Sequence, residues 1–100
     1  MKCIQHYDPP SAGDLAGLKK ELNFTSPQMA ELTGLAQGAH WRKYTGGVTP
    51  RVMGMQMHFY MAALLTLPEE EVAKIIDCMR SQGAEVELGP FPASRVRSTD

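Results

Sequence analysis

The stretch that most constrains the fold runs from residue 26 to residue 47, SPQMAELTGLAQGAHWRKYTGG. Ser26 is a preferred N-cap residue, and Pro27 fits the first helical position, where no backbone N–H is needed. Gly34 ends this helix because glycine adopts the left-handed conformation without a steric penalty. A second short helix is expected from about Gln37 to Thr45. The stretch therefore predicts two short helices joined by a tight turn.

The side chains of these two helices predict how they pack. Ala30 is small, which lets the second helix cross close to the first, and Gly34 makes the sharp turn between them. Trp41 and Tyr44 are three residues apart, so they are expected to share the inward face of the second helix. The two cations between them, Arg42 and Lys43, are then expected on the outer face.

This combination resembles the helix-turn-helix of Cro/repressor-type transcriptional regulators, in particular small phage and mobile-element versions that end in W-R-x-Y/W-x-x-G. The matching residues here are Trp41-Arg42, Tyr44 and Gly47, and the resemblance covers Leu15–Leu65. Between Gly34 and the two aromatic residues the chain has one residue more than the usual pattern. This extra residue predicts a longer turn or a later start of the second helix.

The resemblance implies a sequence-specific regulator of transcription that binds double-stranded DNA with its second helix in the major groove. In such proteins the turn and the outer face of the second helix contact bases. Gln37 suits bidentate pairing with adenine, and Arg42 or Lys43 suits guanine or phosphate. For His40, helix packing is an equal alternative. The expected DNA-binding residues are Gln37, Gly38, His40, Arg42, Lys43 and Arg51.

The distribution of charge bears on this hypothesis, because the formal net charge of the chain is −1. Residues 1–66 hold six Lys/Arg and four Asp/Glu, net +2, whereas residues 67–100 hold four and seven, net −3. No carboxylate lies between Glu31 and Glu69, and we call this interval the acid-free window. A phosphate-facing surface requires such a window, although a buried core excludes acids as well. We favour the phosphate-facing interpretation.

The rest of the chain predicts an all-α fold, a five-helix bundle, with short strands at the two ends. Residues 1–10 are expected to form an N-terminal arm or strand, residues 11–88 the helix-turn-helix domain with a C-terminal helix, and residues 89–100 a tail. Glu85–Leu88 alternates like an edge strand, which could pair with residues 2–6.

Three further helices follow from apolar periodicity and caps. The first is expected at Ser11–Leu22, the fourth from Thr49 and Pro50 to about Thr66, and the fifth from Pro68 to Gly83. The fourth helix is apolar on more than one side, and a chain this short cannot bury all of that surface together with the fifth helix. A homodimer is therefore expected, through a surface that includes Val52, Met55 and Phe59.

The sequence shows no pattern for catalysis, a cofactor or a metal. His6, His40 and His58 lack the spacing and the neighbouring carboxylates of a triad or a metal site. Cys3 and Cys78 match no metal or redox spacing, which favours buried or idle thiols in a reducing cytoplasm. No signal peptide or membrane-spanning run is recognisable. We expect a cytoplasmic protein that is not an enzyme.

A second hypothesis comes from a different class of function. A small phage-encoded protein can keep a helix-turn-helix scaffold and use it to occupy the nucleic-acid site of a host protein, as a CRISPR inhibitor would. The mild acidity of the chain and the Glu69–Glu71 cluster favour this alternative. Gly38 favours it as well, because glycine weakens the first turn of the second helix by about 1 kcal/mol relative to alanine.

Overall fold

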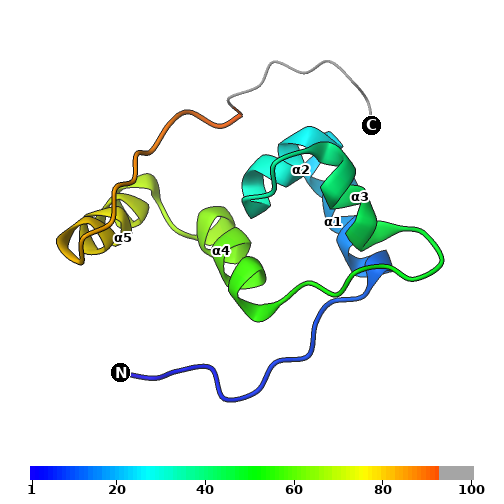
Figure 1. Ribbon diagram of the computed structural model, residues 1–100, viewed down its shortest axis with the longest axis horizontal. Coiled ribbons are helices and arrows are strands. Elements are labelled where there is room, and N and C mark those ends of the chain that lie inside the picture. The colour runs from blue at the N-terminus through cyan, green and yellow to red at the C-terminus, as the bar shows by residue number, and fades with distance from the viewer. Residues whose placement is uncertain (93–100) are drawn as a thin grey trace.

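The computed structural model of the chain describes residues 1–92, and in that range the fold is all-α. The helices are α1 Ala12–Leu22, α2 Ser26–Thr33, α3 Gly38–Thr45, α4 Met55–Thr66 and α5 Glu69–Ser81. Figure 1 shows α1, α2 and α3 together at one end of the molecule, α4 beside α2, and α5 at the opposite end. The all-α, five-helix prediction is confirmed. The predicted terminal strands are wrong, since no residue from 1 to 92 belongs to a strand.

The core lies where the first four helices meet. Trp41 of α3 and Met29 of α2 are completely buried, as is Met53 in the segment before α4. The other residues of this buried cluster are Leu15, Ala30, Leu32, Tyr44 and Met61. The fifth helix contributes none of them, so the core holds α3 but leaves α5 on the periphery.

Reciprocal side-chain caps set the starts of α1 and α2. The Ser11 hydroxyl accepts from the Asp14 N–H (3.0 Å), and the Asp14 carboxylate accepts from the Ser11 N–H (2.9 Å). The hydrogen bond from the Ser11 backbone N–H and that with the Ser11 side chain hold the pKa of Asp14 below its usual value. The backbone hydrogen bond is the larger of the two causes. Thr25 and Gln28 form the same pair before α2. The prediction of Ser26 as N-cap is therefore wrong by one residue, and Ser26 is buried in the first turn.

The largest difference from the predicted helices is the start of α4. The sequence favours a start at Thr49 and Pro50, but α4 begins at Met55 with Gly54 as its N-cap. The intervening residues are irregular, and they place the Met53 side chain in the core with no exposed surface. The free energy gained by burying this large apolar side chain exceeds the free energy that one or two more helical turns would have added after a start at Thr49 and Pro50.

Two hydrogen bonds hold the segment before α4 out of the helix. The Arg51 N–H donates to the Lys43 carbonyl at the end of α3 (2.7 Å). The Tyr7 hydroxyl donates to the Met53 carbonyl (2.8 Å) and lies 3.3 Å from Nδ1 of His58. Burial raises the pKa of Tyr7, so the hydroxyl remains a donor at neutral pH. The N-terminal arm is thus attached to α4 through a side chain instead of pairing as a strand.

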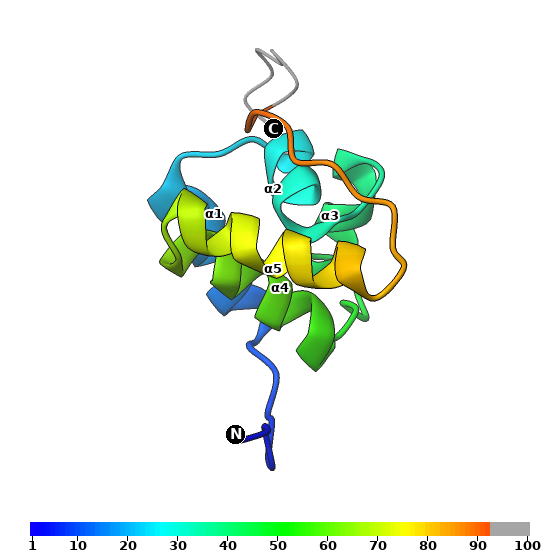
Figure 2. The same cartoon turned by 90° about the vertical axis from the view of Figure 1, so that its left-hand side faces the viewer.

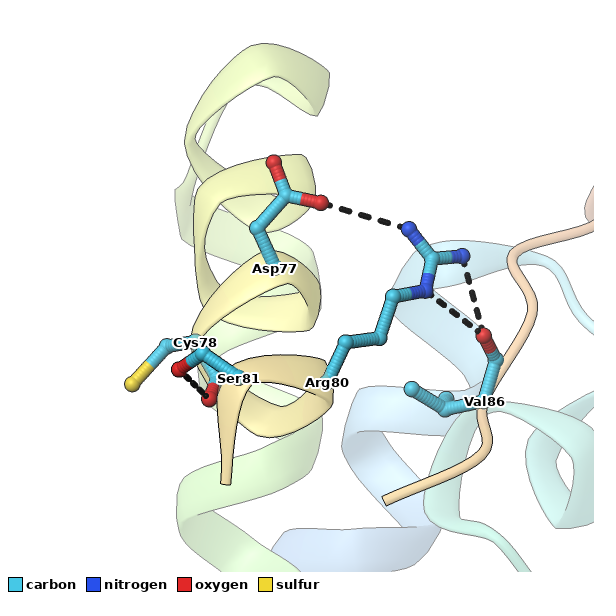
Figure 3. Close-up of polar contacts among 5 residues, drawn as sticks. All are labelled: Asp77, Cys78, Arg80, Ser81 and Val86. Atoms are coloured by element: carbon cyan, nitrogen blue, oxygen red, sulfur yellow. Dashed lines mark hydrogen bonds and ion pairs between the residues drawn. The ribbon is translucent and has the colours of Figure 1, made fainter. Parts of the chain in front are cut away.

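The chain turns back after α5, and a guanidinium group holds the returning segment. Nε and Nη2 of Arg80 donate to the Val86 carbonyl at 3.1 and 2.9 Å, and Nη1 donates to Asp77 at 3.2 Å (Figure 3). The segment then reaches the junction of α1 and α2, where the Phe91 and Phe24 ring centroids are 5.3 Å apart. The predicted C-terminal strand is instead an irregular connection, and residues 93–100 of the expected tail lie outside the described residues.

The start of α3 packs directly against the start of α2. A Cβ atom built on Gly38 would lie 2.9 Å from the backbone nitrogen of Pro27 and 3.0 and 3.1 Å from its Cδ and Cγ. These atoms belong to the backbone and to a rigid ring, so they cannot move aside cheaply. The packing of α3 on α2 therefore requires glycine at this position, and Gly38 is not simply a defect of the helix.

We expect Gly38→Ala to lower the free energy of unfolding by about 1–2 kcal/mol. The steric clash of the added methyl group destabilises the fold more than the higher helix propensity of alanine stabilises it. Gly17→Ala is the matched control, since Gly17 lies in the middle of α1 with nothing within 4 Å of an added Cβ. That variant should gain about 0.5–1 kcal/mol. Denaturant unfolding of both variants measures the difference, and equal stabilisation of the two would contradict the direct packing.

Candidate nucleic-acid interface

A four-residue turn, residues 34–37, joins α2 to α3. Gly34 has a φ of 78°, the left-handed conformation that the sequence predicts. The Leu35 N–H donates to the Ala30 carbonyl (2.7 Å), and Leu35 packs against the core. Ala30 itself is buried, and α2 packs closely against α3. The turn thus fixes α3 against α2 by local hydrogen bonds and by apolar packing, and Figure 1 shows the two helices beside each other.

The third helix has one buried and one exposed face. Trp41 and Tyr44 are buried, as the spacing predicts, and they hold the helix on its scaffold. Arg42 and Lys43 are exposed, also as predicted. His40 has intermediate exposure, so it lies at the edge between the two faces. The exposed face of α3 therefore presents two adjacent cations to the surroundings.

The other predicted site residues occupy different environments. Gln37 is exposed and is the N-cap of α3, where its side chain makes no capping hydrogen bond. Arg51 is exposed, and its N–H bond to the Lys43 carbonyl places it beside the end of α3. Gly38 is buried against Pro27, so it lies away from the exposed face. The structure brings Gln37, Lys43 and Arg51 to α3 or next to it, and gives Gly38 a packing role.

A hollow that the sequence analysis missed lies beside α3. Its volume is about 450 Å³, and it is lined by the last turn of α1, the start of α2 and the second half of α3. We call it the basic hollow, because three of its lining residues are cations and none is acidic; they are Ala16, Lys19, Lys20, Asn23, Phe24, Ser26, Arg42 and Thr45. The two lysines could be noticed in the sequence, but only the fold brings Arg42 to them.

Carboxylates gather at the opposite end of the molecule. The first turn of α5 contains Glu69–Glu71, and Glu71 pairs with Lys74 on the same helix (2.9 Å). Figures 1 and 2 show α5 on the far side of α4 from α3. Since the acid-free window also contains the buried residues Trp41, Met53 and Met61, it is partly core and partly basic surface. The interpretation of the window as core is thus right for part of it, and the phosphate-facing interpretation of the rest stays a prediction.

The residues that the structure describes contain no group of three or more His, Cys, Asp and Glu side chains that could hold a metal ion. Cys3 and Cys78 are free and exposed, so the expectation that they are buried is wrong. None of the helices within residues 1–92 is both long enough and apolar enough to cross a membrane.

Comparison with known protein-family models, with curated proteins and with solved structures gives no match to this chain. Function is therefore inferred from the residues and from their arrangement.

Proposed function

We propose that the protein is a helix-turn-helix transcriptional regulator that binds double-stranded DNA, with α3 as the helix that enters the major groove. The observation that carries the proposal is the two-faced character of α3. Its aromatic face is buried, and its exposed face bears Arg42 and Lys43 inside a stretch without carboxylates. The major groove, about 12 Å wide, admits one α-helix, and cations on that helix meet either guanine or phosphate.

The exposed residues divide into base contacts and backbone contacts. Gln37 begins α3, where an amide can donate to and accept from adenine. Arg42 and Lys43 suit guanine or phosphate, and Arg51, anchored beside Lys43, suits phosphate. His40 lies at the margin of the contacting face. This division predicts that base readout depends on α3, whereas Arg51 adds affinity without sequence preference.

Selection from a library of random duplexes tests this function and at the same time identifies the operator sequence. We expect a defined sequence to be enriched and then bound at least about 10³-fold more tightly than a random duplex at physiological salt. A Gln37→Ala protein should enrich a sequence that is relaxed at one adenine position, because the amide contact is lost. A library from which the wild-type protein enriches no sequence would contradict the proposal.

We further propose that the protein acts as a symmetric homodimer in the cytoplasm. Large apolar side chains are exposed on α4, on α5 and just before α4, namely Val52, Met55, Phe59, Tyr60, Ile75 and Met79. Phe59 is 62% exposed and Val52 is 71% exposed in the single chain, and this exposed apolar surface supports the proposal. A twofold dimer would present two copies of α3 to half-sites about one DNA turn apart.

Replacement of Phe59 tests the dimer. We expect Phe59→Ser to weaken association by about 2 kcal/mol, or roughly 30-fold, if Phe59 is a central contact. Val48→Ser is the matched control, because Val48 is fully exposed in the loop after α3. Sedimentation velocity over a concentration series measures both variants. A wild-type protein that remains monomeric at high micromolar concentration would contradict the dimer.

The alternative is a protein-binding inhibitor on the same scaffold, with a host protein as partner. The exposed glutamates at the start of α5 favour it, since Glu69 and Glu70 could meet basic residues of a nucleic-acid-binding partner. This alternative predicts that DNA affinity is only generic at physiological salt. It also predicts that charge changes at Glu69–Glu71 matter, whereas the DNA-binding proposal predicts that they do not.

A further inference from the structure

The fifth helix has little packing of its own. Within residues 1–92 the closely packed helix pairs are α2 with α3, α1 with α3 and α2 with α4, and none of them includes α5. Ile76 is the only buried residue of α5, and the exposed pair Leu67 and Pro68 joins the helix to α4. A helix that buries so little surface is not held in one orientation by its own contacts. Other parts of the chain must therefore set its orientation.

The chain that follows α5, residues 82–92, is attached firmly to the end of that helix, and we call it the strap. Gly83 has a φ of 100°, the left-handed conformation that reverses the chain at a helix end, and its N–H donates to the Arg80 carbonyl (3.0 Å). The Arg80 guanidinium donates twice to the Val86 carbonyl, at 3.1 and 2.9 Å (Figure 3). The first half of the strap is thus an extension of α5.

The other end of the strap is attached to the part of the molecule that carries α3. The Phe91 ring packs on the Phe24 ring, with centroids 5.3 Å apart and an angle of 57° between the planes. Phe24 lies between α1 and α2 and packs against the core. Val86 and Phe91 are five residues apart, which is at most about 18 Å of extended chain. Figures 1 and 2 show this segment running from α5 toward α2. So short a connection limits how far α5 can move relative to α1, α2 and α3.

The orientation of α5 bears on DNA binding because α5 belongs to the proposed dimer surface. Ile75 is 42% exposed and Met79 is 39% exposed on this helix. In a twofold dimer that uses these side chains, the angle between α5 and α3 determines how the two copies of α3 are placed. A shift of one base pair moves a half-site by about 3.4 Å along the duplex and by about 35° around it. A small change in the orientation of α5 therefore changes the half-site spacing that the dimer matches.

We propose that the strap fixes the half-site spacing that the dimer accepts, with Arg80 and Phe91 as positioning residues at its two ends. The proposal rests on the proposed function and deepens it, since it names the part of the chain that determines the geometry of the operator. Neither residue belongs to α3, so neither reads bases. Because the strap orders the two DNA-binding units before DNA is bound, a wrong spacing requires the duplex to deform or a half-site contact to be lost.

Variants of the duplex selected from the random library, with one base pair added or removed between its half-sites, test the proposal. For the wild-type protein we expect each change to lower the affinity by at least about 10-fold, because the duplex must twist or one half-site is lost. For Phe91→Ala we expect a loss of less than about 3-fold, because the freed α5 adapts and the duplex need not twist. Arg80→Gln should act in the same way. Phe91→Tyr keeps the ring and should restore the wild-type discrimination. Leu88→Ala is the matched control, since Leu88 is an exposed apolar residue of the strap between its two anchors.

A distance measurement within one chain provides a second readout that needs no operator. Spin labels are placed on Cys78, which is exposed on α5, and on Gly17→Cys in α1, where an added Cβ meets nothing within 4 Å, in a Cys3→Ser background. Excess unlabelled protein restricts the measurement to labels of the same chain. We expect double electron–electron resonance to give a single narrow distribution of distances, and a broad one when Phe91→Ala is added.

The possible outcomes separate this proposal from the proposed function. A Phe91→Ala protein that discriminates between spacings as sharply as the wild type, or that keeps the narrow distribution, overturns the proposal and leaves the proposed function standing. A wild-type protein that selects a single, unrepeated site also overturns it, while DNA recognition by α3 stands. A library from which the wild-type protein enriches no sequence refutes the proposed function and the role of the strap in spacing with it. Relaxed spacing together with a broad distribution supports both.

Discussion

Replacement of Trp41 by alanine is expected to lower the free energy of unfolding by about 3–5 kcal/mol, a large share of the roughly 5–15 kcal/mol typical of a domain. The side chain has no exposed surface and lies in the core shared by α1, α2 and α4. Its removal leaves a cavity under α3 and frees the helix that carries the proposed DNA contacts. Denaturant unfolding, monitored by helical circular dichroism, measures the loss.

The conservative variant Trp41→Phe separates volume from hydrogen bonding. The indole Nε1 of Trp41 is buried, and no hydrogen-bond partner for it occurs among the described residues. Phenylalanine removes this unsatisfied donor, whose burial costs about 1–3 kcal/mol. The stability gained in this way offsets part of the stability that is lost with the smaller side chain. We expect Trp41→Phe to cost less than about 2 kcal/mol. A loss as large as that of Trp41→Ala would show that the indole nitrogen has a partner in the folded protein.

The elements that the sequence predicts well are those that local chemistry determines. The end of α2 follows from Gly34, since a tight turn there needs a left-handed residue. The buried face of α3 follows from the spacing of Trp41 and Tyr44. The N-cap of α2 is also predictable, because Thr25 and Gln28 have the spacing of a capping box, but Ser26 and Pro27 offer a competing local signal.

The predictions that are wrong concern segments whose conformation depends on a residue outside the segment itself. Thr49 and Pro50 form a plausible helix start, but the Tyr7 hydroxyl, far away in the sequence, binds the Met53 carbonyl and keeps the chain out of the helix. The alternation of polar and apolar residues over 85–88 suggests a strand, but the Arg80 guanidinium donates a hydrogen bond to the Val86 carbonyl. Periodicity and capping rules do not include such partners, so these two predictions could not have been corrected from the sequence.

The candidate site shows the same division between local and distant causes. The cations of α3 could be predicted, because they lie between two aromatic residues that must be buried. Gly38 looks like a weakness when only helix propensity is considered, and its contact with Pro27 becomes visible only after α2 and α3 are packed. The basic hollow likewise requires α1 and α3 to be placed side by side before Lys19 and Arg42 can line one depression.

The second large expected effect is on DNA binding by the exposed face of α3. Loss of Arg42 and Lys43 together should flatten the salt dependence by about two units of slope if both meet phosphate. If either residue contacts a base, affinity for the selected duplex should fall by about a further 1–3 kcal/mol while affinity for random DNA does not. The sequence preference of the double variant would then be reduced as well as its affinity.

Glu69→Ala is the control for this double variant, because Glu69 is exposed on α5 at the opposite end of the molecule. Its removal should change the slope and the sequence preference very little. A strong effect of Glu69→Ala on binding to a protein partner, together with merely generic DNA affinity, would instead favour the inhibitor hypothesis.

An electrophoretic retardation assay over a salt series, with wild type, Arg42→Ala/Lys43→Ala and Glu69→Ala on the selected and the random duplex, tests the central claim most directly. The proposed function predicts that the wild-type protein prefers the selected duplex. It predicts that Arg42→Ala/Lys43→Ala binds DNA with lower affinity and with a smaller salt dependence, and that Glu69→Ala binds as the wild type does. A wild-type protein without sequence preference, together with an Arg42/Lys43 variant that binds as the wild type does, would contradict it.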